Sequence, residues 1–187
     1  IFDFSKDFQY RVEAELVKGG SGYDLATKLP DVVERQHPDY SLYRCEYAMG
    51  FITRGCIRNC PFCIVPKKEG RIRKVADIKD FWDGQKQIML LDNNLTAMPT
   101  IFKDTLEEII ALNIKVKFSQ GLDIRLINDE MASLLSRVRL WKRIHFAWDN
   151  IRDEKQVIRG FNILTKYVPV YKVTVFVLIG FNSSPEE

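Results

Sequence analysis

The sequence predicts an α/β fold in which a parallel sheet is built from repeated strand–helix units. Two observations support this prediction. From about residue 86 onward, short apolar runs alternate with segments of helical periodicity. The chain of 187 residues is also long enough to bury one substantial core within a single domain.

Five apolar runs are predicted to be strands. Each is short enough for a strand and too apolar for a surface loop, and the last is the clearest because β-branched residues fill it. The predicted strands are residues 47–53, 88–91, 115–118, 143–148 and 172–179.

Four helices are predicted between these strands. The first covers 75–85, and the second follows Pro99, a favourable residue at a helix start, with apolar side chains at helical spacing through Ile110. The third begins after Asn128 as N-cap and buries one face through Val138. The fourth covers roughly 153–167, with Gly160 as a mild internal weakness.

The first part of the chain has a different character. "VKGGSGYDL" is rich in glycine, and "RQHPDYSLY" is typical of an extended linker. We therefore predict a preceding segment and linker over 1–44 and a folded domain over 45–187. The first residue is Ile, and "NSSPEE" directly follows an apolar run, so we expect a piece of a longer polypeptide.

Charge and apolar content exclude some classes of protein. The 28 basic and 25 acidic side chains nearly balance, so overall charge indicates no polyanionic partner. No stretch approaches the roughly 20 apolar residues that cross a bilayer, and the start has no signal-peptide pattern. The four cysteines are not spread as a disulfide framework, so we expect reduced thiols, a cytoplasmic location and no membrane partner.

Polar or small residues follow every predicted strand. In parallel α/β sheets ligands bind at the carboxyl ends of the strands, although each of these residues is also an ordinary turn residue. In strand order they are Arg54, Gly55 and Cys56; Asp92, Asn93 and Asn94; Ser119, Gln120 and Gly121; Asp149 and Asn150; and Gly180 and Asn182.

Three cysteines crowd the loop after the first strand. Cys56, Cys60 and Cys63 form C-x3-C-x2-C, a spacing that lets three thiolates bind one soft metal centre and leaves a coordination position open. A four-cysteine zinc site would need Cys45, across a strand of roughly 23 Å at about 3.3 Å per residue. A thioredoxin-like pair, Cys60 with Cys63, would leave Cys56 without a role. The two histidines are less favoured as ligands because one lies in the linker and the other within a strand.

This loop, with Phe62 before its last cysteine, resembles that of the radical S-adenosylmethionine (SAM) superfamily. The resemblance covers about residues 45–182 and is nearest to uncharacterised radical SAM proteins of bacteria and phages. It implies a partial (β/α)6 TIM-like barrel with outer helices, truncated here after about the fifth strand. It also implies an enzyme that cleaves SAM reductively to a 5'-deoxyadenosyl radical, which abstracts a hydrogen from an unidentified substrate.

The same resemblance implies the residues of the site. Cys56, Cys60 and Cys63 would hold a 4Fe-4S cluster, and Phe62 would meet the adenine of SAM. "LDNN" stands where the family has a glycine-rich motif for the methionine amine, and the missing glycines weaken this match. The SAM contacts that follow are Asp92, Asn93, Asn94, Gln120, Arg125, Asp149, Asn150, Ile179 and Gly180.

The resemblance also bears on cofactors and partners. Residues 17–43 resemble the end of a cobalamin-binding-like domain and its linker, but the Asp-x-His-x-x-Gly signature is absent from the sequence and cobalamin is not predicted. An electron donor such as flavodoxin or ferredoxin is implied. Arg54 and Arg58 would stabilise a negatively charged cluster and lower the thiol pKa values.

The basic segment 54–74 leaves a second function open. It has seven basic residues and one acid, as either a solvated face or the first contact of a nucleic-acid substrate. The alternative to the enzyme is therefore a non-catalytic, cysteine-ligated zinc or iron–sulfur module that binds nucleic acid through this segment.

Overall fold

The computed structural model describes residues 13, 18–21, 23, 25–43 and 45–181. The chain divides into two compact units, Ile1–His37 and Pro38–Glu187. In the glycine-rich stretch of the predicted preceding segment, residues 17, 22 and 24 lie outside the described residues, as do most of the residues before it. In the first unit one short helix is described, α1 (Asp31–Glu34), which begins after Pro30.

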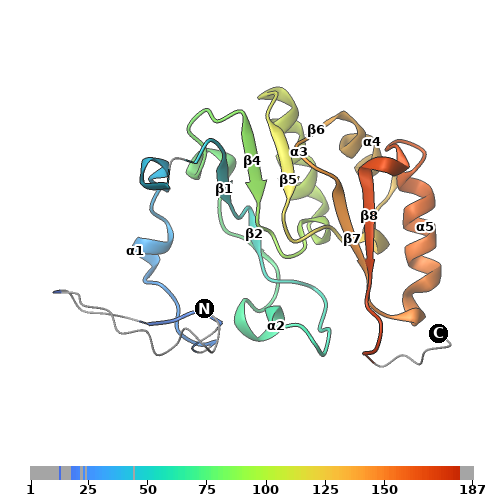
Figure 1. The fold of residues 1–187 in the computed structure, drawn as a ribbon, viewed down its shortest axis with the longest axis horizontal. Coiled ribbons are helices and arrows are strands. Elements are labelled where there is room, and N and C mark those ends of the chain that lie inside the picture. Colours follow the sequence, from blue (N-terminus) through green and yellow to red (C-terminus); the bar gives the residue numbers. More distant parts are fainter. Residues whose placement is uncertain (1–12, 14–17, 22, 24, 44, 182–187) are drawn as a thin grey trace. The chain divides into compact units, whose positions relative to one another are not determined.

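The second unit is an α/β fold with a parallel central sheet (Figure 1). Four strands pair in the order β1-β4-β5-β6, and β7 pairs in parallel with β8. A parallel bridge between Leu122 and Phe146 connects the end of β5 to β7. The strands are β1 (Ala48–Gly50), β4 (Gln87–Leu90), β5 (Lys115–Phe118), β6 (Arg139–Leu140), β7 (Ile144–Trp148) and β8 (Val173–Val177).

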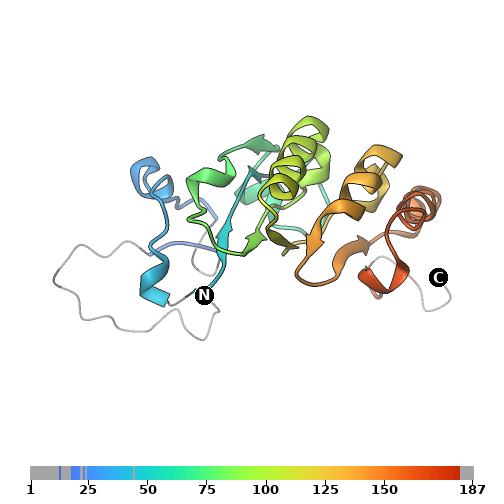
Figure 2. The ribbon, with the colours of Figure 1, turned by 90° about the horizontal axis from the view of Figure 1, so that it is seen from above.

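Three helices pack on one side of these strands, as Figure 2 shows. Buried residues alternate with partly exposed ones along β4, β5 and β7, which is the pattern of strands covered on one face. The helices are α3 (Pro99–Ala111), α4 (Asp129–Arg137) and α5 (Glu154–Leu164).

Local sequence explains where these helices begin. Pro99 is the first residue of α3, where its missing N–H costs nothing. The Asn128 side chain accepts a hydrogen bond from the Met131 backbone N–H at 2.8 Å, so the predicted N-cap of α4 is confirmed. The apolar face predicted for α4, from Met131 through Val138, is buried.

Short elements connect the main ones. A two-stranded antiparallel hairpin joins β2 (Thr53–Arg54) to β3 (Arg73–Lys74) outside the main sheet, and α2 (Val65–Lys68) lies between its strands. Among the described residues the remaining helices are single turns of 3-10 type at Tyr40–Tyr43, Ile78–Asp80, Leu95–Ala97, Ile124–Leu126, Ile151–Asp153 and Val170–Lys172.

Two predicted elements differ from the structure. The strand over 47–53 is divided, because the chain leaves the main sheet after Gly50 and β2 pairs with β3. The helix over 75–85 is wrong: only Ile78–Asp80 is helical. The backbone N–H groups of Val75 and Ala76 bond to the Ile52 carbonyl, and Gly84 has a φ of 87°, so both ends of this segment are held out of helical conformation.

The α/β class and the parallel sheet are confirmed. Closure of these strands into a partial barrel stays a prediction. Among the described residues no helix is long and apolar enough to cross a membrane.

Candidate metal-cluster site

The cysteine loop begins at the carboxyl end of β2. Gly55 has a φ of 87°, and a Cβ there would lie 2.5 Å from the Arg71 carbonyl oxygen, so the position requires glycine. The Cys56 N–H donates to the Gly70 carbonyl at 3.2 Å, and the Cys63 N–H donates to the Cys60 carbonyl at 3.0 Å. All three cysteines of the loop are half-buried.

Asp92 fixes the bend from which this loop starts. Its buried carboxylate accepts hydrogen bonds from the backbone N–H groups of Ile52, at 3.2 Å, and Thr53, at 2.5 Å. The Thr53 hydroxyl also donates to it at 2.6 Å. Burial raises the pKa of Asp92, and the bonds from Thr53 and Ile52 oppose that rise. Asp92 therefore holds the strand end in place.

The next two residues hold the loop itself. The Asn93 side-chain oxygen accepts from the Gly55 N–H at 3.0 Å. The Asn94 Nδ2 donates to the Cys56 Sγ at 3.4 Å, and the Arg58 backbone N–H donates to the same sulfur at 3.3 Å. Two N–H donors therefore already point at one predicted ligand sulfur, which is how proteins surround cluster-bound cysteines.

A buried ion-pair network lies behind the loop. Asp123, at the end of the β5 segment, accepts from the Arg58 Nε at 2.9 Å and from Arg125 through Nε at 2.7 Å and Nη2 at 3.0 Å. The Arg125 Nη1 also donates to Asp153, which precedes α5. Burial alone would raise the pKa of Asp123, but the hydrogen bonds and charges of Arg125 and Arg58 hold it below its ordinary value.

The thiols of the loop lie within electrostatic reach of one another. Burial raises the pKa of the Cys60 thiol; Arg125 opposes that rise, while Asp149, Cys63 and Cys56 add to it. The predicted lowering of thiol pKa values is therefore wrong for Cys60, because desolvation outweighs the nearby positive charge. The two arginines expected to supply that charge are also already paired, Arg54 with Glu69 at 3.3 Å and Arg58 with Asp123.

The donor set fits a cluster better than a single ion. Within the described part of the chain, no three His, Cys, Asp or Glu side chains form a group that could hold one metal ion. In a 4Fe-4S cluster each cysteine binds a different iron, so the sulfurs surround the cluster and do not converge on one atom. The three thiols are half-buried, and two N–H donors reach the sulfur of Cys56; their cluster-binding role stays a prediction.

Phe62 connects the loop to the far strand. Its ring is 43% exposed and packs edge-on against Phe181, with ring centroids 5.3 Å apart. Phe181 follows Gly180 directly, and Ile179 is 81% exposed beside it. The structure thus places Phe62 against the residue that follows Ile179 and Gly180. Their contact with the adenine stays a prediction.

The other predicted contacts have different surroundings. Asp149 is half-buried, and burial raises its pKa while Arg125 lowers it. Gln120 and Asn150 are exposed, and the Asn150 side chain accepts from the Arg152 N–H at 2.9 Å as a helix cap. These three residues and Arg125 stay predicted SAM contacts.

Sequence reasoning missed four residues of the site. Asp123, Asp153, Thr53 and Thr96 all bind residues that were predicted; the Thr96 hydroxyl donates to Asn94 at 2.8 Å and accepts from the Asp123 N–H at 3.0 Å. The one available signal was in "SQGLDIR", where Asp123 is an acid between two apolar residues.

Two residues considered as ligands lie elsewhere. His145 is in the middle of β7, with its ring 5.4 Å from that of Phe176. Cys45 precedes β1, at the opposite end of that strand from the cysteine loop, and its N–H bonds to the Tyr40 carbonyl.

Comparison with known proteins connects this site to a family. No family model matches the chain. A tRNA-2-methylthio-N(6)-dimethylallyladenosine synthase from Sulfurihydrogenibium is 24% identical over 156 residues, which are 70% of this chain and 36% of that protein. The ribosomal protein uS12 methylthiotransferases RimO of Pseudomonas fluorescens and Nitrosomonas europaea are 27% and 29% identical over 104 residues, which are 54% of this chain and 22% of theirs.

A solved structure shares the fold. The radical SAM methyltransferase TsrM of Kitasatospora setae, with cobalamin and a [4Fe-4S] cluster bound, superposes with a TM-score of 0.55 at 15% identity, over 70% of this chain and 30% of TsrM. The chain thus spans about a third or less of each of these proteins. The related sequences, the shared fold and the C-x3-C-x2-C loop agree with the resemblance to the radical S-adenosylmethionine superfamily.

Proposed function

We propose that the chain is the SAM-binding core of a radical SAM enzyme. The observation that carries this proposal is the cysteine loop at the carboxyl end of the first strand, with three half-buried thiols and two N–H donors directed at the Cys56 sulfur. Cys56, Cys60 and Cys63 would hold a 4Fe-4S cluster. Such a cluster, when bound and reduced, supplies the electron that cleaves SAM to the 5'-deoxyadenosyl radical that removes a substrate hydrogen.

The residues of the chain would position the cofactors. Phe62, Ile179 and Gly180 would form the side of the cofactor site that receives the adenine. Asp92, Asn93 and Asn94 would form the other side, beside the cysteines, and their hydrogen bonds hold the loop whose thiols would bind the cluster. The support for this division is the Phe62–Phe181 contact on one side and the Asn94–Cys56 contact on the other.

Arg125 is the proposed partner of the SAM carboxylate. Its Nε and Nη2 are held by the buried Asp123, and its Nη1 by Asp153, whose side chain is 30% exposed. A SAM carboxylate would therefore reach Arg125 by replacing the Asp153 contact. A guanidinium is suited to this exchange because its planar donors fit carboxylates.

An electron donor of the flavodoxin or ferredoxin type is part of the proposal. The class of substrate is less narrowly defined. The names of the relatives give a tRNA adenosine as the target of one and ribosomal protein uS12 as the target of the other. For this chain a nucleic-acid substrate is proposed through the basic segment 54–74, where Lys67, Arg71 and Arg73 are exposed. The non-catalytic alternative has no comparable support, because the related proteins are enzymes.

The test is anaerobic reconstitution of the full protein with iron and sulfide. We expect about four irons per chain, a visible absorption shoulder that reduction removes, and release of 5'-deoxyadenosine from SAM when dithionite is added. Cys60→Ala should lose the iron and the cleavage, whereas Cys45→Ala, the same chemical change before β1, should keep both. A colourless protein with one zinc, lost in both variants, would overturn the proposal in favour of a four-cysteine site.

A further inference from the structure

A second concave site lies at the opposite edge of the sheet from the cysteine loop. Its volume is about 510 Å³, within the range of ligand pockets in proteins. Gln87, Lys115 and Arg139, the first residues of β4, β5 and β6, line it. Because the strands are parallel, their amino ends share one edge, and the carboxyl ends with the cysteines share the other.

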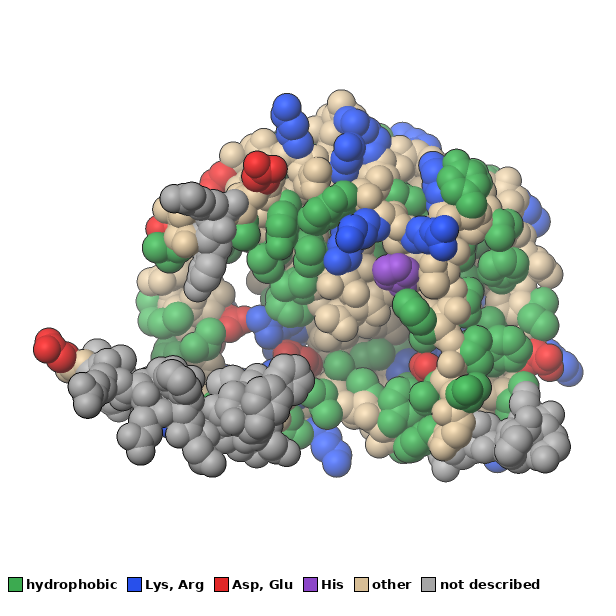
Figure 3. Space-filling model, in the orientation of Figure 1, with side chains coloured by type: hydrophobic (Ala, Val, Ile, Leu, Met, Phe, Trp, Pro, Cys, Tyr) green, Lys and Arg blue, Asp and Glu red, His purple; other side chains and the backbone are tan. Residues whose placement is uncertain are grey.

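Three cations line this pocket and no acid does. Lys86, Lys115 and Arg139 are the charged lining residues, and within the described part of the chain none of them forms an ion pair with a carboxylate. Asp83, a neighbour of Trp82 in the chain, is outside the lining. Figure 3 shows Lys and Arg side chains gathered above the amino ends of the strands. Such a concentration of positive charge favours a phosphate group.

Arg139 lies on one wall of the pocket, where Asn113 fixes its side chain. Its Nη1 donates to the Asn113 carbonyl at 3.3 Å and to the Asn113 side-chain oxygen at 3.0 Å. Asn113 itself has a φ of 55°, a conformation that asparagine tolerates better than most residues and that ends α3 with its carbonyl toward Arg139. The remaining donors of the guanidinium are left for a ligand.

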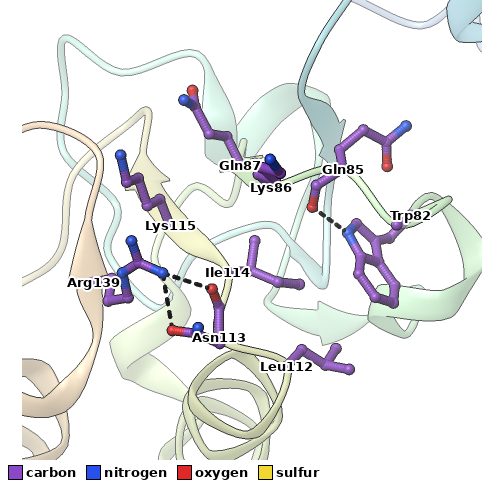
Figure 4. Close-up of a pocket in the computed structure, with 10 residues that line it drawn as sticks. Trp82, Gln85, Lys86, Gln87, Leu112, Asn113, Ile114, Lys115 and Arg139 are labelled. Carbon is purple, nitrogen blue, oxygen red and sulfur yellow. Dashed lines mark hydrogen bonds between the residues drawn. The ribbon is translucent and has the colours of Figure 1, made fainter.

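The other wall is apolar and flat. Trp82 is half-buried, and its Nε1 donates to the Gln85 carbonyl at 2.9 Å, which fixes the ring. Figure 4 shows Trp82 on one side of the pocket and Lys115 with Arg139 on the other, while Leu112 and Ile114 lie between them. Gln85 and Gln87 also line the pocket. A fixed aromatic ring opposite paired cations suits a ligand with a planar base and a phosphate.

We infer that this pocket binds a nucleoside phosphate, with the phosphate at Lys86, Lys115 and Arg139 and the base against Trp82. The ligand is either a nucleotide within a single strand of RNA or a free nucleotide. This inference is independent of the proposed SAM chemistry, because it uses none of the residues at the carboxyl edge.

The experiment measures binding by the full protein. A fluorescein-labelled single-stranded RNA 12-mer is titrated by anisotropy, and ATP and pyrophosphate are used as competitors. The variant is Lys86→Gln/Lys115→Gln, which leaves the Arg139–Asn113 contact intact. The matched control is Lys155→Gln/Lys166→Gln, which removes the same charge from α5 and the residues just after it. Circular dichroism checks that both variants keep the fold.

We expect the pocket variant to weaken RNA binding about tenfold and to reduce the salt dependence, by about 1.4 in the log–log slope for two lost phosphate contacts on a single strand. The control should change binding by less than about twofold. If RNA binds, the pocket variant weakens that binding and ATP does not compete, the ligand is a strand. If ATP binds directly and the pocket variant weakens it, the ligand is a free nucleotide; both results support the inference.

Two results would overturn it. In one, the pocket variant and the control variant both bind RNA and ATP as well as the original protein does, or both lose binding to the same extent. In the other, pyrophosphate competes as well as ATP and Trp82→Leu binds normally, since the base would then contribute nothing.

Discussion

Gly160 lies where α5 meets the backbone of Ile124. A Cβ at this position would be 1.9 Å from the Ile124 carbonyl oxygen and 2.9 Å from its carbonyl carbon, and backbone atoms cannot move aside as a flexible side chain could. The sequence predicted only that Gly160 weakens the helix mildly, whereas the structure shows that the packing here requires a residue without a side chain. The glycine lets α5 approach Ile124–Leu126, the turn that carries Arg125.

We expect Gly160→Ala to destabilise the protein. Within an unobstructed helix this change gains about 1 kcal/mol, but here the new methyl group overlaps a carbonyl, and overpacking costs about 1–3 kcal/mol. The measurement is the free energy of unfolding in urea. Asn162→Ala, at an exposed position of the same helix, is the control and should be neutral or slightly stabilising. An increase in stability for Gly160→Ala would show that the approach to Ile124 is looser than described.

At the scale of elements, Asp123 joins three pieces that are distant in sequence. Through Arg58 it binds the cysteine loop, through Thr96 it binds the turn after β4, and through Arg125 it binds the start of α5. Its side chain is 4% exposed. Replacing it would leave two arginines without their shared buried carboxylate, so the position of the loop depends on it.

Asp123→Asn should destabilise the protein by about 2–3 kcal/mol near neutral pH, because hydrogen bonds to charged partners are lost. Asp153→Asn, which removes only the more exposed contact of Arg125, should cost clearly less. The pKa of Asp123 is lowered in the fold, so its contribution is present above about pH 4 and is lost as the pH falls through the folded pKa.

The measurement is the free energy of unfolding of both variants against pH. The difference between Asp123→Asn and the original protein should shrink in acid. Equal costs for the two variants, or a difference that grows in acid, would contradict this account of the network.

The divided first strand is also a property of elements. Three hydrogen bonds to Asp92 bend the chain between Gly50 and Thr53, and a Cβ at Gly50 would lie 2.4 Å from the Phe81 ring. The apolar letters of "YAMGFIT" predicted one strand because they contain no sign of either contact. Both partners, Asp92 and Phe81, lie at least 30 residues away along the chain.

At the scale of the molecule, the boundary between the two units falls between His37 and Pro38. The predicted boundary was after residue 44. Tyr40 belongs with the second unit: its hydroxyl accepts from the Met49 N–H at 3.0 Å and donates to the Phe81 carbonyl at 2.5 Å. The linker-like composition of "RQHPDYSLY" gives no sign of this contact, because a single tyrosine hydroxyl changes the composition of the segment very little.

Two truncations distinguish these boundaries. We expect a chain of residues 38–187 to unfold as cooperatively as the full sequence and at a similar urea concentration. A chain of 45–187 should be less stable by about 1–3 kcal/mol, because the Met49 and Phe81 backbone groups lose the Tyr40 hydroxyl. Urea denaturation followed by circular dichroism measures both. If the two chains are equally stable, the boundary after residue 44 is the better one.

The sequence by itself determined the α/β class, the strands β4, β5, β7 and β8, the main helices after Pro99 and Asn128, and the cysteine loop at a strand end. These features are local: periodicity, capping residues and the C-x3-C-x2-C spacing are each written within about a dozen neighbouring residues. They were enough to suggest the family.

Only the tertiary structure decided which partners those residues have. Asn94 binds the Cys56 sulfur, Asp123 pairs with Arg58 and Arg125, Gly160 meets Ile124, and the amino ends of three strands enclose a cationic pocket. Except for the neighbouring pair Asp123 and Arg125, each depends on segments that folding brings together across 24 to 65 residues, and the desolvation that raises the Cys60 pKa exists only once they are packed. A sequence specifies the charges of a site, whereas burial decides how strongly they act.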